Sequence, residues 1–263
     1  MGERIINPIH NSFKQYKKMN LVNPYLFANI QLNTGLSAYY KFDSNSNASF
    51  GGINGTPVFI TYTGGKIGNC AVFNNFTARI DLADSDIFSF TSGVGVDLPF
   101  SFSLWVYVTA FSSVSNFLIN KRGDSTNTEW QMSLTPTGQI SFTKFSGGGN
   151  TVFQTVRTPS SSISINTWTH IVFTSDGSKI ALNDKIYVNG VNMSLTNASS
   201  GTYTGMVNGN SITRIGLNAW DLLNPNLRHQ GYIDELGIWK NKTLNSGEVT
   251  TLYNYGSGRS YPF

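Results

Sequence analysis

Hydrophobic and polar residues alternate with a period of two along most of this chain, a pattern that predicts β-strands. At 166–173, for example, Trp168, His170 and Val172 point to one face, and Ile171 and Phe173 point to the other. The same alternation predicts strands at 36–43, 67–73, 78–82, 100–108, 115–121, 129–135, 139–145, 151–157, 186–191, 212–217 and 231–239. We expect the segments 67–73 and 78–82 to pair as a hairpin. Asn189 and Gly190 tolerate the positive φ of a tight turn and predict another hairpin.

One convincing helix is expected after Leu244. Asn245 can cap its first turn and Glu248 stands three residues further on, which is the spacing of a capping box. Gly256 is a suitable terminator. The helix is short, so we expect it to cover one part of a β-sandwich. The fold class predicted is all-β, with two antiparallel sheets packed face to face.

The order of these segments resembles the laminin G-like domains of the concanavalin A-like lectin/glucanase superfamily, over residues 35–256. The matching segments are Gly35–Asp43, Gly65–Phe73, Phe102–Val106, Asn166–His170, Tyr187–Gly190, Gly231–Trp239 and Leu244–Tyr253. The resemblance implies a jelly-roll sandwich with a short C-terminal helix, in a family that supplies mostly binding modules. We therefore expect a laminin G-like domain at 35–263.

Residues 1–34 have no counterpart in that pattern, and we expect them to form an extended N-terminal arm. The segment is basic and carries apolar anchors, and it lacks the apolar core of a secretory signal. It is similar to the particle-attachment peptides of bacteriophage virion proteins. This similarity implies a place on the virion surface, other virion subunits as partners, and many copies per particle. The candidate attachment residues are Arg4, Ile5, Ile6, Pro8, Phe13 and Tyr16.

Composition and charge exclude several functions. Charged residues make up 12% of the chain, against about 25% in an average soluble domain. The formal net charge is +4, and residues 1–34 hold four basic residues and one glutamate, so +3 of it lies there. The remaining domain is close to neutral and is a poor candidate for binding nucleic acid. No segment is apolar enough to insert into a membrane, and the single cysteine, Cys70, excludes an internal disulfide.

Catalytic chemistry has little support in the sequence. A retaining glycosidase needs two carboxyl groups about 5 to 5.5 Å apart, and no glutamate pairs with an aspartate on one face of a clear strand. Asp84 and Asp86 have the spacing but read as a turn, and Asp234 and Glu235 are neighbours that point to opposite faces. His170 is expected to be a packed residue. We therefore predict a protein that is not an enzyme.

Calcium is the metal that the resemblance suggests, because calcium takes oxygen ligands. In such domains an aspartate after the first strand and an aspartate in the last hairpin can share a structural Ca²⁺. The matching positions are Asp43 and Asp234, with Asn54 in a loop that can supply a further oxygen. The alternative is that the two aspartates cap a turn or make hydrogen bonds.

Sugar binding would use aromatic faces together with amide, carboxylate and guanidinium groups. Two loop regions offer this mixture, and the candidates are Arg122, Trp130, Trp220 and Asp221. The alternative for each tryptophan is core or rim packing. The leading hypothesis is a non-enzymatic phage surface or fibre protein that binds glycans or a host surface, strengthened by avidity. The rivals are a purely structural decoration module, a glycoside hydrolase and a cell-surface adhesin.

Overall fold

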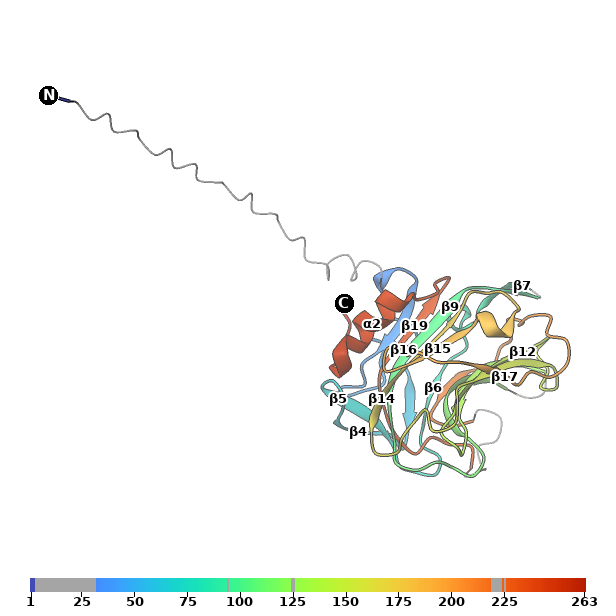
Figure 1. The fold of residues 1–263 in the computed structure, drawn as a ribbon. Coiled ribbons are helices and arrows are strands. Elements are labelled where there is room, and N and C mark those ends of the chain that lie inside the picture. The colour runs from blue at the N-terminus through green and yellow to red at the C-terminus, as the bar shows by residue number, and fades with distance from the viewer. Residues whose placement is uncertain (3–31, 94, 124–125, 219–223, 225) are drawn as a thin grey trace.

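A computed structural model describes residues 1–2, 32–93, 95–123, 126–218, 224 and 226–263. Within these residues the chain folds as a sandwich of two large antiparallel sheets (Figure 1). The fold class predicted from the alternation is confirmed. The candidate arm residues Arg4, Ile5, Ile6, Pro8, Phe13 and Tyr16 lie outside the described residues.

The first sheet has nine strands. Its main order is β16 (Val191–Asn192), β15 (Lys185–Val188), β14 (Trp168–Ser175), β9 (Phe100–Val108), β19 (Gly231–Lys240), β1 (Leu36–Tyr40) and β2 (Phe50–Gly51), with β5 (Asn69–Phe73) paired to β19 and β4 (Thr61–Gly64) paired to β5. The strands at its centre, β14, β9 and β19, are far apart in sequence. The sheet therefore depends on non-local pairing.

The second sheet has eight strands. Its order is β17 (Thr196–Asn197), β13 (Phe153–Arg157), β12 (Ile140–Phe145), β11 (Thr128–Leu134), β10 (Asn116–Arg122), β18 (Thr213–Ile215), β6 (Arg79–Leu82) and β3 (Thr56–Val58). From β10 to β13 the strands are neighbours in sequence and in space. A separate two-stranded ribbon joins β7 (Thr91–Gly93) and β8 (Val96–Asp97), and three short 3₁₀ turns occur at η1 (Asp86–Phe88), η2 (Ala181–Asn183) and η3 (Asn254–Gly256).

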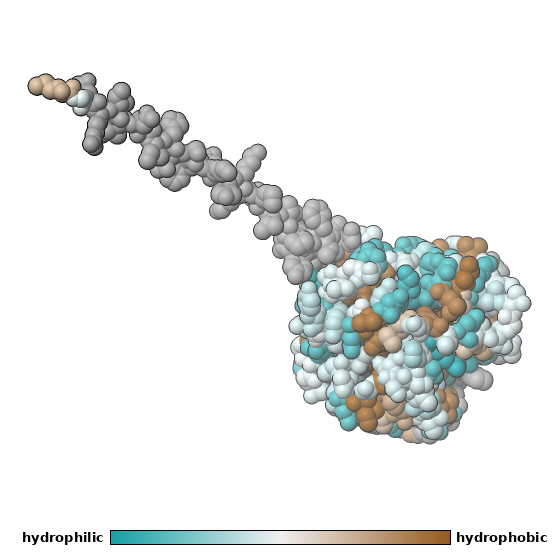
Figure 2. Space-filling view, in the orientation of Figure 1, coloured by the Kyte–Doolittle hydropathy of each residue, from teal (hydrophilic) through white to brown (hydrophobic). Residues whose placement is uncertain are grey.

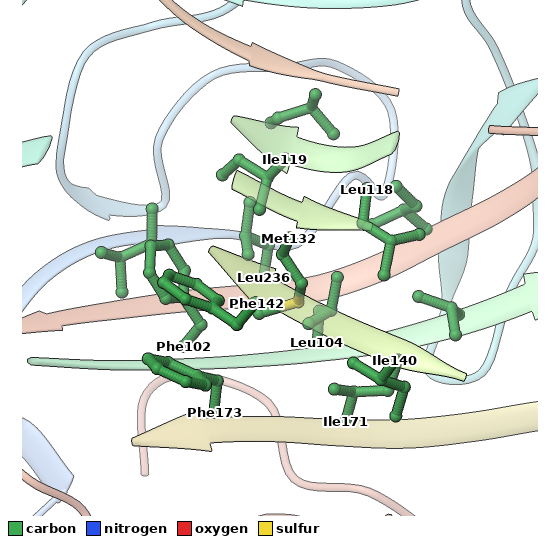
Figure 3. Packing of buried hydrophobic residues seen from close by; sticks show 14 of the residues in the cluster. Phe102, Leu104, Leu118, Ile119, Met132, Ile140, Phe142, Ile171, Phe173 and Leu236 are labelled. Atoms are coloured by element: carbon green, nitrogen blue, oxygen red, sulfur yellow. The ribbon is translucent and has the colours of Figure 1, made fainter. Parts of the chain in front are cut away.

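The core lies between the two sheets. Figure 3 shows Phe102 and Leu104 of β9 and Phe173 of β14 facing Phe142 of β12 and Met132 of β11. The rings of Phe142 and Phe173 stack with centroids 3.6 Å apart. These contacts follow from the predicted alternation, because every second residue of each strand points inward.

The helix α2 (Ser246–Tyr253) packs on the outer side of the first sheet (Figure 1). The predicted capping box is confirmed, with reciprocal hydrogen bonds between Asn245 and Glu248. Val249 and Leu252 join Leu244 and Trp239 in a smaller apolar cluster. The helix thus buries the apolar residues on that side of the sheet, as expected of a lid.

Two hairpin predictions have different outcomes. The turn at Asn189–Gly190 is confirmed, with φ of 50° and 81° and with β15 paired to β16. The hairpin expected from 67–73 and 78–82 is wrong, because β5 pairs with strands of the first sheet and β6 with strands of the second. The short connection between them crosses the sandwich. The alternation of apolar and polar residues predicts where a strand lies, but it does not predict which strand it pairs with.

The surface in view in Figure 2 is largely polar, with apolar residues in separate patches. This agrees with a chain of low charge whose exterior is covered by uncharged polar residues. No helix among the described residues is long and apolar enough to cross a membrane.

Candidate functional site

The outward side of the second sheet carries a polar groove. On β11 and β12 the inward positions are taken by Trp130, Met132 and Phe142, so the residues between them face away from the core. Together with residues of β10 and β13 they line a cavity of about 220 Å³. The lining residues of this polar groove are Ser115, Arg122, Gln131, Ser133, Thr135, Ser141, Thr143, Phe145, Asn150, Phe153, Thr155 and Arg157.

Strand register places these side chains in rows across the sheet. Thr155, Thr143 and Gln131 are successive partners on β13, β12 and β11, and the hydroxyls of the two threonines are hydrogen-bonded at 2.8 Å. A parallel row contains Arg157, Ser141 and Ser133. The floor of the groove is therefore built from hydroxyl and amide groups, which both donate and accept hydrogen bonds.

An aromatic and cationic cluster occupies one end of the groove. Phe145 and Phe153 are cross-strand partners whose ring centroids lie 6.0 Å apart. The guanidinium carbon of Arg122 lies 5.2 Å from the centroid of the Phe145 ring. Arg122 Nη1 donates to Gln131 Oε1 at 2.8 Å, and burial lowers the pKa of Arg122 from its ordinary value. An arginine still keeps its charge, because its unperturbed pKa lies so far above neutrality.

A second cavity adjoins the polar groove and shares Ser115, Arg122 and Gln131 with it. It has a volume of about 410 Å³ and is also lined by Val114, Phe117, Asn218, Asn224 and Leu227. Arg122 thus stands where the two depressions meet. Of the predicted sugar-binding residues, Arg122 is the one that lies at a groove in the described structure.

The prediction for Trp130 is corrected by the structure. Its side chain is fully buried between the sheets, and its indole Nε1 donates to the carbonyl of Phe88 at 2.8 Å. A ring in that position presents no face to a sugar. Trp220 and Asp221 lie outside the residues that the structure describes.

Most of the groove was missed by sequence reasoning, although a signal for it was present. In 129–135 the apolar residues Trp130, Met132 and Leu134 alternate with Gln131 and Ser133. Placing the apolar set inward would have put Trp130 in the core and the polar set on the outer face. The strand pairing that collects four such polar sets side by side has no comparable local signal.

The predicted calcium ligands are brought together in part. Asp234 Oδ2 accepts from the backbone N–H groups of Lys66 and Ile67 at 2.8 and 3.0 Å, and Asp43 Oδ1 accepts from that of Asn69 at 2.9 Å. Both carboxylates therefore hold one loop, between β4 and β5. Asp234 Oδ1 is buried without a hydrogen-bond partner, and burial raises the pKa of this carboxyl to about 8.

Asn54 does not join the two aspartates in any described contact. Its Oδ1 accepts from the backbone N–H of Ala48 at 3.1 Å. Within the described ranges no three His, Cys, Asp or Glu side chains gather as a metal-binding group. Calcium bound by Asp43, Asp234 and the Asn54 loop therefore stays a prediction.

The other titratable side chains considered in the sequence analysis either bond to neighbouring residues or are buried. Asp84 pairs with Lys121 at 2.8 Å, and Asp86 Oδ1 accepts from Asn208 Nδ2 at 2.8 Å. His170 is buried, with Nε2 hydrogen-bonded to Ser103 Oγ at 2.9 Å, and burial lowers its pKa to about 3. Cys70 is a buried free thiol whose pKa is raised to about 12, mainly by desolvation. His170 is a packed residue, as expected, and Cys70 is packed as well.

A comparison with protein families identifies the family of this chain. A family model of the laminin G type, described as the concanavalin A-like lectin/glucanases superfamily, matches residues 77–250. The chain belongs to this superfamily. The resemblance noted in the sequence is thus confirmed for the domain, and no match was found among curated protein sequences.

Solved structures share the fold at low sequence identity. Domain 4 of AbnA, an extracellular GH43 arabinanase from Geobacillus stearothermophilus solved with arabinotriose, is 22% identical with a TM-score of 0.58, over 85% of this chain and 98% of that one. The binding domain of botulinum neurotoxin serotype D is 14% identical with a TM-score of 0.61, over 86% of this chain and 52% of that one. The sialidase of Trypanosoma rangeli is 14% identical with a TM-score of 0.58, over 84% of this chain and 32% of that one. The chain spans about half of the toxin domain and a third of the sialidase.

Proposed function

We propose that this protein is a non-enzymatic glycan-binding module and that the polar groove of the second sheet is its binding site. The observation that carries the proposal is the composition of the groove. Hydroxyl and amide groups form its floor, and a phenylalanine pair and two arginines stand along it. Sugar rings present hydroxyl groups at their edges and C–H groups on their faces, so such a mixture of polar and aromatic side chains is complementary to them.

Similar structures support the proposal by what they bind. The arabinanase domain was solved with arabinotriose. Entry of botulinum neurotoxin type C, another protein of similar fold, depends on two ganglioside molecules. Proteins that contain this fold thus interact with oligosaccharides or glycolipids, and the groove offers a surface for such a ligand here.

The groove supports binding and gives no support to hydrolysis. No aspartate or glutamate is found among its described lining residues, and most glycoside hydrolases use two carboxyl groups. Incubating the protein with the polysaccharides that it binds should release no reducing ends. Measurable release that survives purification of the protein to homogeneity would favour the glycosidase rival.

Glycan binding is tested with the full chain displayed in multivalent form on a broad glycan panel, because weak sites gain from avidity. Phe153→Ala and Gln131→Ala remove a half-buried aromatic and a half-buried amide from the groove. Each should weaken binding by roughly 5- to 30-fold, which corresponds to about 1 to 2 kcal/mol. Phe76→Ala is the matched control, because Phe76 is 42% exposed and does not line the groove.

Two results would count against the groove as a glycan site. One is the absence of binding to any glycan in the panel. The other is equal binding by wild type and by both groove variants when their melting temperatures show that they are folded.

The biological setting proposed is the surface of a bacteriophage particle, reached by host lysis and with residues 1–34 as the attachment segment. Its support is the sequence similarity of that segment, of which residues 3–31 lie outside the described residues. Mass spectrometry of purified particles tests the setting, and a variant lacking residues 1–34 tests attachment. Normal incorporation of that variant would remove the attachment role.

A purely structural decoration module is the second candidate. A botulinum neurotoxin binding domain of similar fold was solved in complex with rat synaptotagmin II, so a protein partner is compatible with the fold. This candidate predicts incorporation into particles without glycan binding. The glycan panel and the incorporation assay together separate the two.

A further inference from the structure

We propose that the Arg157 end of the polar groove binds an anionic oxyacid group, so that the ligand is an acidic glycan. This inference deepens the proposed function and rests on it. Arg157 is the last residue of β13 and lines the groove. Its strand partner is Ser141, whose own partner is Ser133, so two hydroxyl side chains extend from it across the sheet.

The positive charge of Arg157 has no counter-charge in the described structure. Its Nε is shielded from solvent and has no hydrogen-bond partner, and its side chain is half-buried. No aspartate or glutamate of the described residues forms a salt bridge with it. A shielded donor that lacks a partner costs free energy, and a ligand that supplies the acceptor would recover it.

Three cations with almost fully buried side chains are compensated by carboxylates in the described structure. Lys121 pairs with Glu129, Lys144 with Asp184, and Arg214 with Asp81. All three cationic side chains are at most 6% exposed. Arg157 has no such carboxylate partner, and it lies at a position where a groove opens to solvent. The contrast indicates that its counter-charge comes from outside the chain.

The chemistry of the guanidinium group selects the ligand class. Its planar N–H donors match two oxygens of a carboxylate, sulfate or phosphate and bind them more strongly than a neutral acceptor. Asn150, another lining residue, has a buried Oδ1 that accepts no hydrogen bond. An acceptor of this kind suits the hydroxyl of a sugar. One ligand that meets both requirements is a glycan bearing an acidic group.

The groove is long enough for more than one sugar unit. From β10, which carries Arg122, to β13, which carries Arg157, there are three interstrand spacings, or about 14 Å. Both arginines face a groove whose described lining includes no carboxylate. We therefore expect an oligosaccharide anchored by its acid group at Arg157.

The test measures binding by calorimetry to matched pairs of oligosaccharides that differ in charge. Oligogalacturonate is compared with its methyl ester, and sialyllactose with lactose. A chondroitin sulfate oligosaccharide and a phosphorylated mannan oligosaccharide distinguish sulfate and phosphate from carboxylate. Wild type should bind at least one acidic ligand about 10- to 100-fold more tightly than its neutral partner, the range expected for a charge-assisted hydrogen bond.

Arg157→Gln should bring the ratio of acidic to neutral affinity close to one, and Arg157→Lys should restore part of it. Lys185→Gln is the charge-matched control, because Lys185 is exposed on β15 of the other sheet, and it should leave the ratio unchanged. A ratio near one in wild type, or an unchanged ratio in Arg157→Gln, would overturn the acidic-ligand proposal. Neutral glycans that bind at the groove would then leave the proposed function standing, whereas no binding to any ligand would remove both.

Discussion

The ion pair between Lys144 and Asp184 gives a stability prediction that depends directly on the sandwich. Lys144 is on β12 of the second sheet, and Asp184 precedes β15 of the first sheet. Lys144 Nζ lies 2.8 Å from Asp184 Oδ2, and both side chains are 1% exposed. Burial raises the pKa of Asp184, and the charge of Lys144 opposes that rise. The pair thus links the two sheets inside a poorly solvated region.

We predict that Lys144→Met destabilises the fold by about 3 to 5 kcal/mol at neutral pH, because it leaves a buried carboxylate without its partner. For a domain of this size that corresponds to a fall in Tm of roughly 6 to 20 °C. Lys144→Met combined with Asp184→Asn removes both charges and should recover at least half of the loss. Lys185→Met, at an exposed neighbouring position, should cost less than about 0.5 kcal/mol.

The loss should also depend on pH. In Lys144→Met the folded-state pKa of Asp184 lies above its unfolded value, so the folded protein binds more protons and loses stability as pH rises between those two values. The assay is urea unfolding followed by tryptophan fluorescence at pH 4.5 and pH 7.5. The larger deficit relative to wild type is expected at pH 7.5. Equal deficits at both pH values, or a double variant as unstable as the sum of the singles, would refute a buried, charge-compensated pair.

Three further predictions concern the buried Trp130, the cap of the C-terminal helix and calcium. Trp130→Ala should cost about 3 to 5 kcal/mol by leaving a core cavity, whereas Trp130→Phe should stay folded and bind glycans as wild type does; selective loss of binding in Trp130→Phe would restore the surface role predicted from sequence. Asn245→Ala removes one half of the capping box with Glu248 and should cost about 1 kcal/mol in urea unfolding; no measurable change would mean that the lid helix is held by its apolar contacts alone. If Asp43 and Asp234 share calcium, adding a chelator should lower Tm, because ion binding stabilises the folded state, and a Tm unaffected by chelator and by added Ca²⁺ would remove the calcium prediction.

The elements that were predicted well are those with local causes. Strands appeared where inward and outward residues alternate, as in Phe100–Val108, whose alternate residues all lie in the core. The capping box and the Asn189–Gly190 turn depend on side chains within a few residues of each other. Such features need no knowledge of distant parts of the chain.

The two errors have different causes. The hairpin expected from 67–73 and 78–82 failed because β5 and β6 find their partners elsewhere in the chain. The surface role expected for Trp130 rested on its place beside a polar loop, although its alternation with Gln131 already favoured the core. The hairpin error came from the choice of strand partners, whereas the Trp130 error came from setting this local alternation aside.

The sequence by itself determined the longer strands, the short helix and the family, because alternation, capping and motif order are local features of the chain. Short strands such as β3 and β4 were not predicted. Only the tertiary structure decided which polar side chains share a surface. Gln131, Thr143 and Thr155 are ordinary outward residues of three strands until sheet pairing sets them in one row. Packing of the two sheets brought Lys144 to the carboxylate of Asp184, whereas Arg157 faces a groove whose described lining has no carboxylate. Opposite charges stabilise each other only when they are close in space, and residues far apart in sequence come that close only in the folded protein.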